Sequence, residues 1–345
     1  MLGKEKLREV ADRVLDLSNA DQTEVLIFSG DEYLTRFAAN TIHQNVSETD
    51  VTVRIRAVFG KKVGVASGND LSDAALEKTV QAAETVARFQ QDNPEFETLP
   101  EPKPYQEANA YVEATADYTP RERAKGVADI CGLARKDDLE AAGAFSTAKS
   151  EIMVANSLGV SAYHRSTLAH LVTVIMGEDS SGYASATDLD VSKINPQETG
   201  KTAVEKALQS RQPTEIEPGD YTVILEEEAV ADMLFTLGYI GLGALAMQEG
   251  RSFMSKRLGE KITGSKINIW DDGHDPRGLV LPFDFEGVPK QRVSLIEKGI
   301  AKGVVYDTFT ANREEGKTST GHSLPAPNTM GPLPINLFMA PGKAT

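Results

Sequence analysis

Histidine spacing gives the first test of whether this sequence can build a catalytic metal site. A helical zinc-peptidase site needs two histidines four or five residues apart on one helix face, with a glutamate beside the first. His164 and His170 come nearest, but they are six apart, in strand-like sequence with no acidic residue between them. We therefore expect no metal ligands in this chain and interpret its histidines as core or surface residues. The full set is His43, His164, His170, His274 and His322.

Other residue types with possible chemistry also lack the required neighbours. Cys131 is the single cysteine, which excludes an intramolecular disulfide and a cysteine-rich zinc site, and its apolar helical position indicates a small core residue in a reducing compartment. The segment 316–318 ends like a phosphate-binding loop, but Ala311 occupies the position that needs glycine, and no G-x-S-x-G motif occurs. The acidic run 226–228 is best interpreted as favourable charge at a helix N-terminus. We expect no catalytic residue.

Composition indicates an ordinary acidic globular protein. The 345 residues suffice for two or three domains, and 40% of them are apolar. A net charge of −15 disfavours a primary role in nucleic-acid binding, and we interpret the basic stretch 251–257 as a solvated face. The charged N-terminus lacks a signal-peptide pattern. The apolar run 233–247 is too short to cross a bilayer, so we expect a buried helix, no membrane contact and a cytoplasmic protein.

Hydrophobic periodicity predicts an α+β protein that begins with an α/β domain over residues 1–90. A helix over 4–17 and a second one beginning at Ser72 flank a small antiparallel sheet. Asp31 is expected to begin a turn between two of its strands, and the segment 60–62 to form a hairpin. The predicted strands cover 24–28, 33–37, 42–46, 51–57 and 63–66.

Proline content marks the next boundary. Residues 91–106 contain four prolines without periodicity and are predicted to be a linker, followed by a middle α/β domain over 107–212 and a C-terminal β-rich domain over 219–345. The middle domain is expected to have helices after Pro120 and over 196–210, and strands at 142–147, 151–156, 161–164 and 169–175. The C-terminal domain is expected to have a helix over 227–247 and strands at 221–225, 266–270, 292–297 and 303–307.

Five segments, taken in order along the chain, resemble the TldD/PmbA family, peptidases once named modulators of DNA gyrase. Each alone is weak, but together they extend over essentially the whole chain. They are residues 35–45, 156–160, 218–225, 250–262 and 340–345.

The resemblance implies two kinds of family member. The catalytic kind carries H-E-x-x-x-H on the helix before the segment that corresponds to 250–262, and the TldE/PmbA-like kind lacks it. An ungapped alignment places Phe235, Thr236 and Ile240 at the motif positions, and none of these can ligate zinc strongly. The resemblance also implies a barrel-like C-terminal domain. Because relatives continue past the segment that ends here at Thr345, we expect this domain to be truncated.

The resemblance therefore predicts a zinc-less subunit of a peptide-processing metalloprotease. A TldD-like partner would bind the zinc, extended peptides would be the substrates, and a homodimer is possible. Phe235, Thr236, Tyr239 and Ile240 would form an apolar wall of the peptide cleft, unless that helix belongs to the core. Two alternatives stay open: an autonomous metallopeptidase with an unrecognised site, and a regulatory or scaffold protein linked to DNA gyrase.

Overall fold

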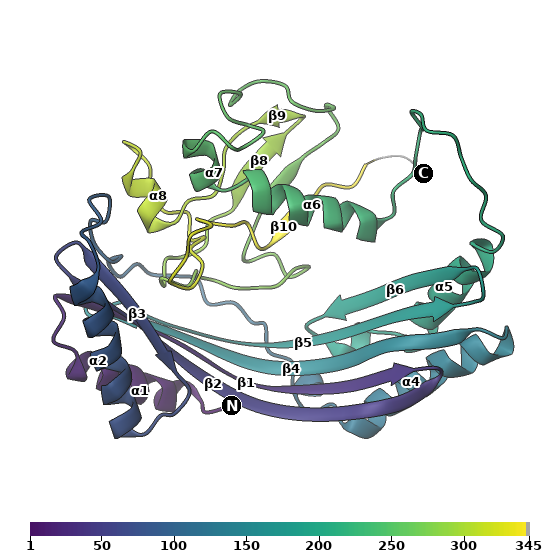
Figure 1. The fold of residues 1–345 in the computed structure, drawn as a ribbon, viewed down its shortest axis with the longest axis horizontal. Helices are drawn as coiled ribbons and strands as arrows, with labels where there is room; N and C mark the ends of the chain where they lie inside the picture. The colour runs from purple at the N-terminus through teal and green to yellow at the C-terminus, as the bar shows by residue number, and fades with distance from the viewer. Residues whose placement is uncertain (343–345) are drawn as a thin grey trace.

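The computed structural model describes residues 1–342 and shows a mixed α+β fold, as the sequence predicts. A long antiparallel sheet with the order β3-β2-β1-β4-β5-β6 curves beneath the C-terminal part of the chain, which lies over its concave face (Figure 1). The strands are β1 Gln22–Ala38, β2 Thr41–Phe59, β3 Lys62–Gly68, β4 Glu140–Asn156, β5 Ser161–Met176 and β6 Ser181–Asp188.

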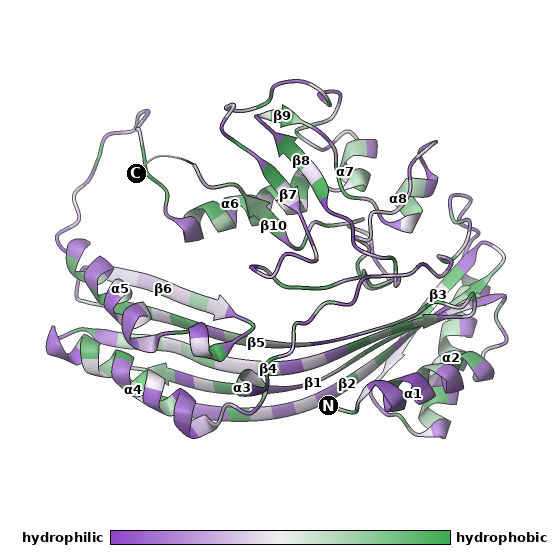
Figure 2. Cartoon of the chain, turned by 180° about the vertical axis from the view of Figure 1, so that it is seen from behind, coloured by the Kyte–Doolittle hydropathy of each residue, from purple (hydrophilic) through white to green (hydrophobic). Residues whose placement is uncertain are grey.

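Helices cover the convex face of this sheet, seen from both sides in Figures 1 and 2. Helix α1 buries one stripe of apolar residues against the sheet, as its helical spacing predicts. Helix α4 starts at Pro120 behind a capping box in which Thr119 and Glu122 satisfy each other's backbone N–H groups. The bounds are α1 Lys4–Leu17, α2 Asp73–Phe89, α3 Glu113–Ala116, α4 Pro120–Lys136, the 3₁₀ helix η1 Val191–Lys193 and α5 Pro196–Gln209.

The strands are longer than the sequence predicts, and the turn expected at Asp31 is wrong. Asp31 lies inside β1, where its carboxylate is 3.2 Å from the N-terminal amine and 3.3 Å from Lys149 Nζ, and it accepts a 2.7 Å hydrogen bond from Thr49. These three partners satisfy a charge that would otherwise favour a turn, so the strand continues. Four predicted strands therefore merge into two.

The hairpin predicted at 60–62 is confirmed, and a second tight turn joins β4 to β5. Gly60, with φ 58°, turns β2 into β3, and Phe59 pairs directly with Lys62. Asn156 closes the turn between β4 and β5 by accepting backbone hydrogen bonds from Leu158 and Val160, each 3.0 Å long. The polar edge strand β6 was not predicted, because its serine-rich sequence lacks a clear alternation.

The C-terminal part has its own small sheet, with the order β10-β7-β8-β9, which is not closed into a barrel within residues 1–342. The strands predicted at 221–225 and 303–307 are wrong: the first is coil with exposed side chains, and the second contains one isolated bridge, between Val305 and Gly243. None of the helices in the described part of the chain is long and apolar enough to span a membrane. The bounds are α6 Glu227–Gly241, α7 Ala244–Gln248, β7 Ile269–Asp271, β8 Val293–Glu297, β9 Ile300–Ala301, α8 Thr308–Asn312 and β10 Leu337–Met339.

An apolar cluster joins the C-terminal part to the concave face of the long sheet. Phe283 is buried against Leu26 and Val154, and its ring meets that of Tyr105 edge-on at 5.0 Å. Gly287, with φ 78°, lies so close to the sheet that an added Cβ would be 2.5 Å from Val160. This junction fixes the loop 283–288 against the sheet beside the candidate site.

Candidate functional site

Helix α6 carries Phe235, Thr236, Tyr239 and Ile240, the residues predicted to form a cleft wall, and it is exposed rather than buried. The exposed fraction is 74% for Phe235, 54% for Tyr239 and 47% for Ile240, and Thr236 is also exposed. The expectation of a buried helix over this run is therefore wrong. Most of α6 is coloured as apolar in Figure 2. An apolar run in the sequence shows that the residues are hydrophobic, but it does not show that another part of the chain covers them.

The single helix predicted over 227–247 is also wrong, because glycines divide it. Helix α6 ends at Gly241, and α7 begins after Gly243. A Cβ on Gly243 would lie 2.2 Å from the carbonyl oxygen of Pro332, and one on Gly241 would lie 2.6 Å from the ring of Phe253. The chain can approach this closely only without side chains at those positions.

Both ends of α6 are fixed by contacts with other elements, although much of the helix is exposed. At its N-terminus, Glu228 accepts hydrogen bonds from the backbone N–H and the hydroxyl of Ser185 on β6, both 2.9 Å long. Glu226 is 2.5 Å from Lys206 Nζ on α5. Near its C-terminus, Gly238 packs against Leu337 of β10. The acidic run thus lies at the helix N-terminus as predicted, and the helix bridges the two sheets.

The rings of His164, His170 and His322 have hydrogen-bond partners within the chain, and His164 lies near His274. The structure places no cluster of three or more His, Cys, Asp or Glu residues suited to a metal ion among the residues it describes. The Nε2 atom of His164 is 3.0 Å from the carbonyl oxygen of Val280, and His170 is 2.7 Å from the hydroxyl of Thr187. Burial lowers the pKa of His164, which favours the neutral ring. Cys131, on α4, is buried in the core, as predicted.

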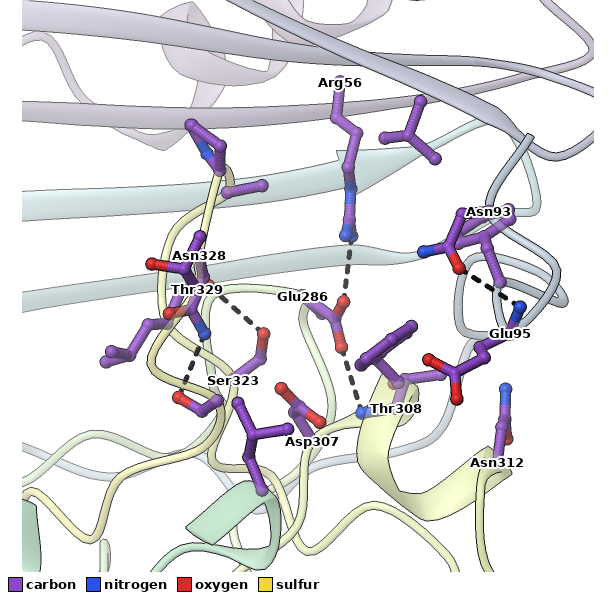
Figure 3. A pocket seen from close by; sticks show the side chains of 18 of the residues that line it. Arg56, Asn93, Glu95, Glu286, Asp307, Thr308, Asn312, Ser323, Asn328 and Thr329 are labelled. Carbon is purple, nitrogen blue, oxygen red and sulfur yellow. Dashed lines mark hydrogen bonds and ion pairs between the residues drawn. The ribbon is translucent and has the colours of Figure 1, made fainter. Parts of the chain in front are cut away.

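A cavity of about 840 Å³ lies between the long sheet and the C-terminal part, and no sequence motif indicated it (Figure 3). Its walls come from β2 and β3, the C-terminal end of α2, the segment 90–98, helices α7 and α8, and the loop 323–331. Its volume is typical of ligand sites, which usually occupy about 300–1,000 Å³. The walls are parts of the chain more than 200 residues apart in sequence, which is why motif search does not find the cavity.

A buried ion network forms one wall of this cavity. The Nη2 atom of Arg56 on β2 donates to Glu24, its direct cross-strand partner on β1, and to Glu286 Oε1 at 3.0 Å. Figure 3 shows Arg56 reaching from the sheet to Glu286, whose other oxygen accepts a 3.4 Å hydrogen bond from the backbone of Thr308. Burial raises the pKa of Glu24 to about 7, although Arg56 opposes the rise. The network therefore links sheet to C-terminal part through charges that water reaches poorly.

Asp284 holds Glu286 in position. Its carboxylate accepts backbone hydrogen bonds from Glu286 at 3.0 Å, Val288 at 2.9 Å and Ser323 at 2.9 Å. Burial raises the pKa of Asp284 to about 7, and the neighbouring Glu286 adds to the rise. These three bonds fix the loop 284–288 and connect it to the loop that closes the cavity.

A second buried pair lies behind this loop. His322 Nε2 is 2.7 Å from Asp271 Oδ1, and both side chains are fully buried. Burial and the nearby Lys290 lower the pKa of His322 to about 4, while burial also lowers the pKa of Lys290. The imidazole is therefore neutral at pH 7 and donates to the Asp271 carboxylate. We interpret this pair as structural, because both residues are sealed inside the C-terminal core.

Comparison with known proteins gives the chain a family. Residues 23–87 match the PmbA/TldA metallopeptidase domain 1, residues 99–211 the central domain, and residues 218–345 the C-terminal domain of the same peptidases. The chain belongs to the PmbA/TldD family. The resemblance predicted from five short segments is thus confirmed over nearly the whole length.

Individual relatives agree with this assignment. Metalloprotease PmbA of Escherichia coli O157:H7 is 26% identical over 336 residues, which are 92% of this chain and 73% of that protein. A TldD homologue from Haemophilus influenzae is 25% identical over 320 residues, covering 86% of this chain and 65% of its own length. The chain therefore spans about two thirds to three quarters of these two curated relatives.

Two solved structures share the fold. TldE from Thermococcus kodakarensis superposes with a TM-score of 0.82 at 20% identity, covering 98% of this chain and 78% of its own. A Thermotoga maritima protein whose name refers to modulation of a DNA gyrase gives 0.84 at 23% identity, with coverages of 97% and 78%. These identities support the architecture alone.

The residues that the ungapped alignment places at the metal-motif positions do not fit a zinc ion. Phe235 and Ile240 have no donor atom, and Thr236 offers one hydroxyl, whereas zinc in proteins is held by imidazole, thiolate and carboxylate groups. The acidic neighbours Glu226 and Glu228 are already bound at the start of the helix. We therefore derive no chemical step through a metal on this chain.

Proposed function

We propose that this chain is a non-catalytic subunit of a metallopeptidase assembly that acts on unstructured peptides. A zinc-bearing TldD-like subunit would cleave the peptide, and this chain would contribute one wall of the cleft. Phe235, Thr236, Tyr239 and Ile240 on α6 are the proposed wall. The site of action would be the cytoplasm.

The observation that carries this proposal is the exposed apolar face of α6. A soluble helix normally turns such residues toward a core, and exposed contiguous apolar surface usually marks an interaction site. Aromatic residues at such a surface bind by burial, and Tyr239 adds a hydroxyl that can pair with a peptide backbone. Both ends of the helix are anchored, so its exposed apolar residues keep a fixed position. A fixed apolar wall suits side chains of an extended peptide.

Reconstitution with a purified catalytic relative tests the subunit role. Cleavage of an unstructured fluorogenic peptide is measured with the zinc-bearing subunit alone, with added chain, and with the Phe235→Ser/Tyr239→Ser variant. We expect the native chain to raise cleavage and the variant to lose most of that gain, because truncating an aromatic contact at an interface centre costs about 2 kcal/mol or more. Phe89→Ser is the matched control, since Phe89 on α2 is 88% exposed and lies away from α6.

Three outcomes would overturn the proposal. An unchanged cleavage rate with native chain refutes the subunit role, and equal activity of the α6 variant and native protein refutes the assigned wall. About one tightly bound zinc per chain in metal analysis of the purified protein, together with peptide cleavage by the chain alone, would instead establish an autonomous peptidase.

A further inference from the structure

Strand β3 is the outer strand of the long sheet, and its outward backbone groups have no partner within residues 1–342. The two-residue turn makes Phe59 and Lys62 a hydrogen-bonded pair, so alternate residues from Lys62 onward bond to β2. The N–H and C=O groups of Val63, Val65 and Ser67 therefore point away from the sheet. An unpaired edge of this kind is a template for another strand.

The opposite edge of the same sheet is partly blocked, which makes the open edge of β3 distinctive. On β6, the N–H of Ser185 donates to Glu228, and the N–H and C=O of Ser181 both bond to the hydroxyl of Ser210. The chain thus protects one edge with side chains and leaves comparable groups free on the other.

The cavity of about 840 Å³ lies along this open edge. Val63 and Val65 both contribute to its wall, and Val86 of α2 contributes from the other face of the sheet, so the cavity extends around the edge of β3. Phe96 and Phe309 add apolar surface opposite the strand. A strand added to β3 would place alternate side chains in this apolar space, because successive side chains of a strand point to opposite faces.

The charge of the cavity selects the kind of strand it would accept. Its wall contains five carboxylates, those of Glu95, Glu97, Glu249, Glu286 and Asp307, and the two guanidinium groups of Arg56 and Arg313. Both guanidinium groups are already paired, Arg56 with Glu24 and Glu286, and Arg313 with Glu95 at 3.1 Å. Glu249 is likewise paired, with Arg251 at 2.5 Å, so the excess negative charge favours a cationic side chain near Glu97, which is exposed.

We propose that the edge of β3 and the adjoining cavity form a binding site for an extended peptide that carries a lysine or arginine flanked by apolar residues. The peptide adds a seventh strand to the sheet, its backbone bonds to Val63, Val65 and Ser67, and its basic side chain lies near Glu97. Backbone pairing supplies affinity and the cavity supplies selectivity, as in other cases of strand addition. This site is separate from α6 and needs no partner subunit.

Fluorescence anisotropy with labelled ten-residue peptides tests the site on the full chain. The probe alternates valine and threonine around one central lysine, and a second peptide has glutamate in its place. We expect the lysine peptide to bind at least tenfold more tightly. A third peptide has N-methyl groups on the alternate amides that would face β3, and it should lose binding, whereas methylation of the other amides should not.

Proline substitution on the strand gives the matched variants. Val65→Pro removes one outward N–H without breaking a bond to β2, and edge strands tolerate proline at such positions. We expect about tenfold weaker binding, from one lost hydrogen bond plus the steric effect of the ring. Tyr183→Pro, at an outward position on the opposite edge strand β6, is the control and should bind as the native chain does.

A charge-reversal variant tests the same site without introducing proline, whose effect on folding could also weaken binding. Glu97→Lys should weaken the lysine peptide and strengthen the glutamate peptide, whereas Glu107→Lys, which alters an exposed residue outside the cavity, should change neither. Hydrogen exchange should slow in residues 62–68 when peptide binds, and stay constant in 181–188. Equal binding of both peptides to native and Val65→Pro chains overturns the proposal. A native dimer that Val65→Pro converts to monomer would also overturn it, by assigning the edge to a second copy of this chain.

Discussion

Replacing Arg56 by methionine tests whether the buried ion network joins the two parts of the molecule. The substitution keeps the length of the side chain but removes the only positive charge beside Glu24 and Glu286 among the described residues. Their side chains are 4% and 7% exposed, and that of Arg56 is 12% exposed. Two carboxylates would then share a site that water reaches poorly, with no cation between them.

The size of the effect follows from that burial. Removing one partner of a buried ion pair typically costs about 3–5 kcal/mol of unfolding free energy, because the remaining charge is left without compensation. The loss should depend on pH. With its pKa raised to about 7, Glu24 binds a proton more readily in the folded than in the unfolded chain, so its contribution to stability is present below pH 4.5 and is lost as the pH rises through 7. We therefore expect Arg56→Met to destabilise most at pH 8 and least at pH 5.

Urea unfolding at both pH values measures this. Trp270 is the single tryptophan and lies on β7, so its fluorescence reports on the C-terminal part, while far-ultraviolet circular dichroism is dominated by the rest of the chain. We expect the fluorescence transition of Arg56→Met to move to lower urea concentration. Arg121→Met, on the exposed surface of α4, is the control and should stay within about 0.5 kcal/mol of the native chain.

Rescue provides the decisive comparison. The triple variant Arg56→Met/Glu24→Gln/Glu286→Gln removes every charge of the network and should recover at least half of the lost stability, because neutral amides cost less to bury than carboxylates. If Arg56→Met lies within about 1 kcal/mol of the native chain at pH 8, the network does not hold the two parts together.

Two further predictions concern the C-terminal part. Gly287→Ala should lower the unfolding free energy by about 2 kcal/mol, because its new Cβ would meet Val160. The control Gly259→Ala, with φ 84° and no atom within 4 Å, should show only the smaller cost of its backbone conformation. Equal losses of the two variants in urea unfolding would contradict the close contact at Gly287. His322→Gln should destabilise the folded chain by about 3 kcal/mol more at pH 7 than at pH 4. The pKa of the native ring is lowered from its ordinary value of 6.5 to about 4, so the stability that the neutral ring provides above pH 6.5 is lost as the pH falls through that window. A loss of stability that is the same at pH 7 and at pH 4 would refute this.

Local patterns in the sequence predicted the helices that cover the long sheet well and the strands only in pieces. The apolar residues within 4–17 recur with the 3.6-residue period of a helix, so the sequence alone indicates the helix and its buried face. Strand β1 continues through Asp31 because Lys149, far along the chain, lies beside it in the sheet. The hydrophobic pattern of residues 22–38 cannot indicate this contact with Lys149.

The site shows the same limit. That Phe235 and Ile240 cannot ligate a metal could be predicted from residue types, since neither side chain has a donor atom. The exposure of α6 could not be predicted from the sequence. An apolar run is normally interpreted as buried, and the sequence does not show which other segment, if any, covers it. The Glu24–Arg56–Glu286 network depends on the register of β1 against β2 and on a loop 230 residues beyond Arg56.

The continuous sheet also sets an order of events during synthesis. Strand β1 pairs with β2, which follows at once, and with β4, which begins only at residue 140. At about 5–20 residues per second, a ribosome needs roughly 5–20 s to make the intervening hundred residues. During that interval the backbone groups of β1 that will bond to β4 are unpaired, and the core side chains Val25 and Ile27 lack their neighbours Met153 and Ala155. The nascent first third of the chain is therefore the stage at which a chaperone, or a slower ribosome, would most affect the yield of folded protein.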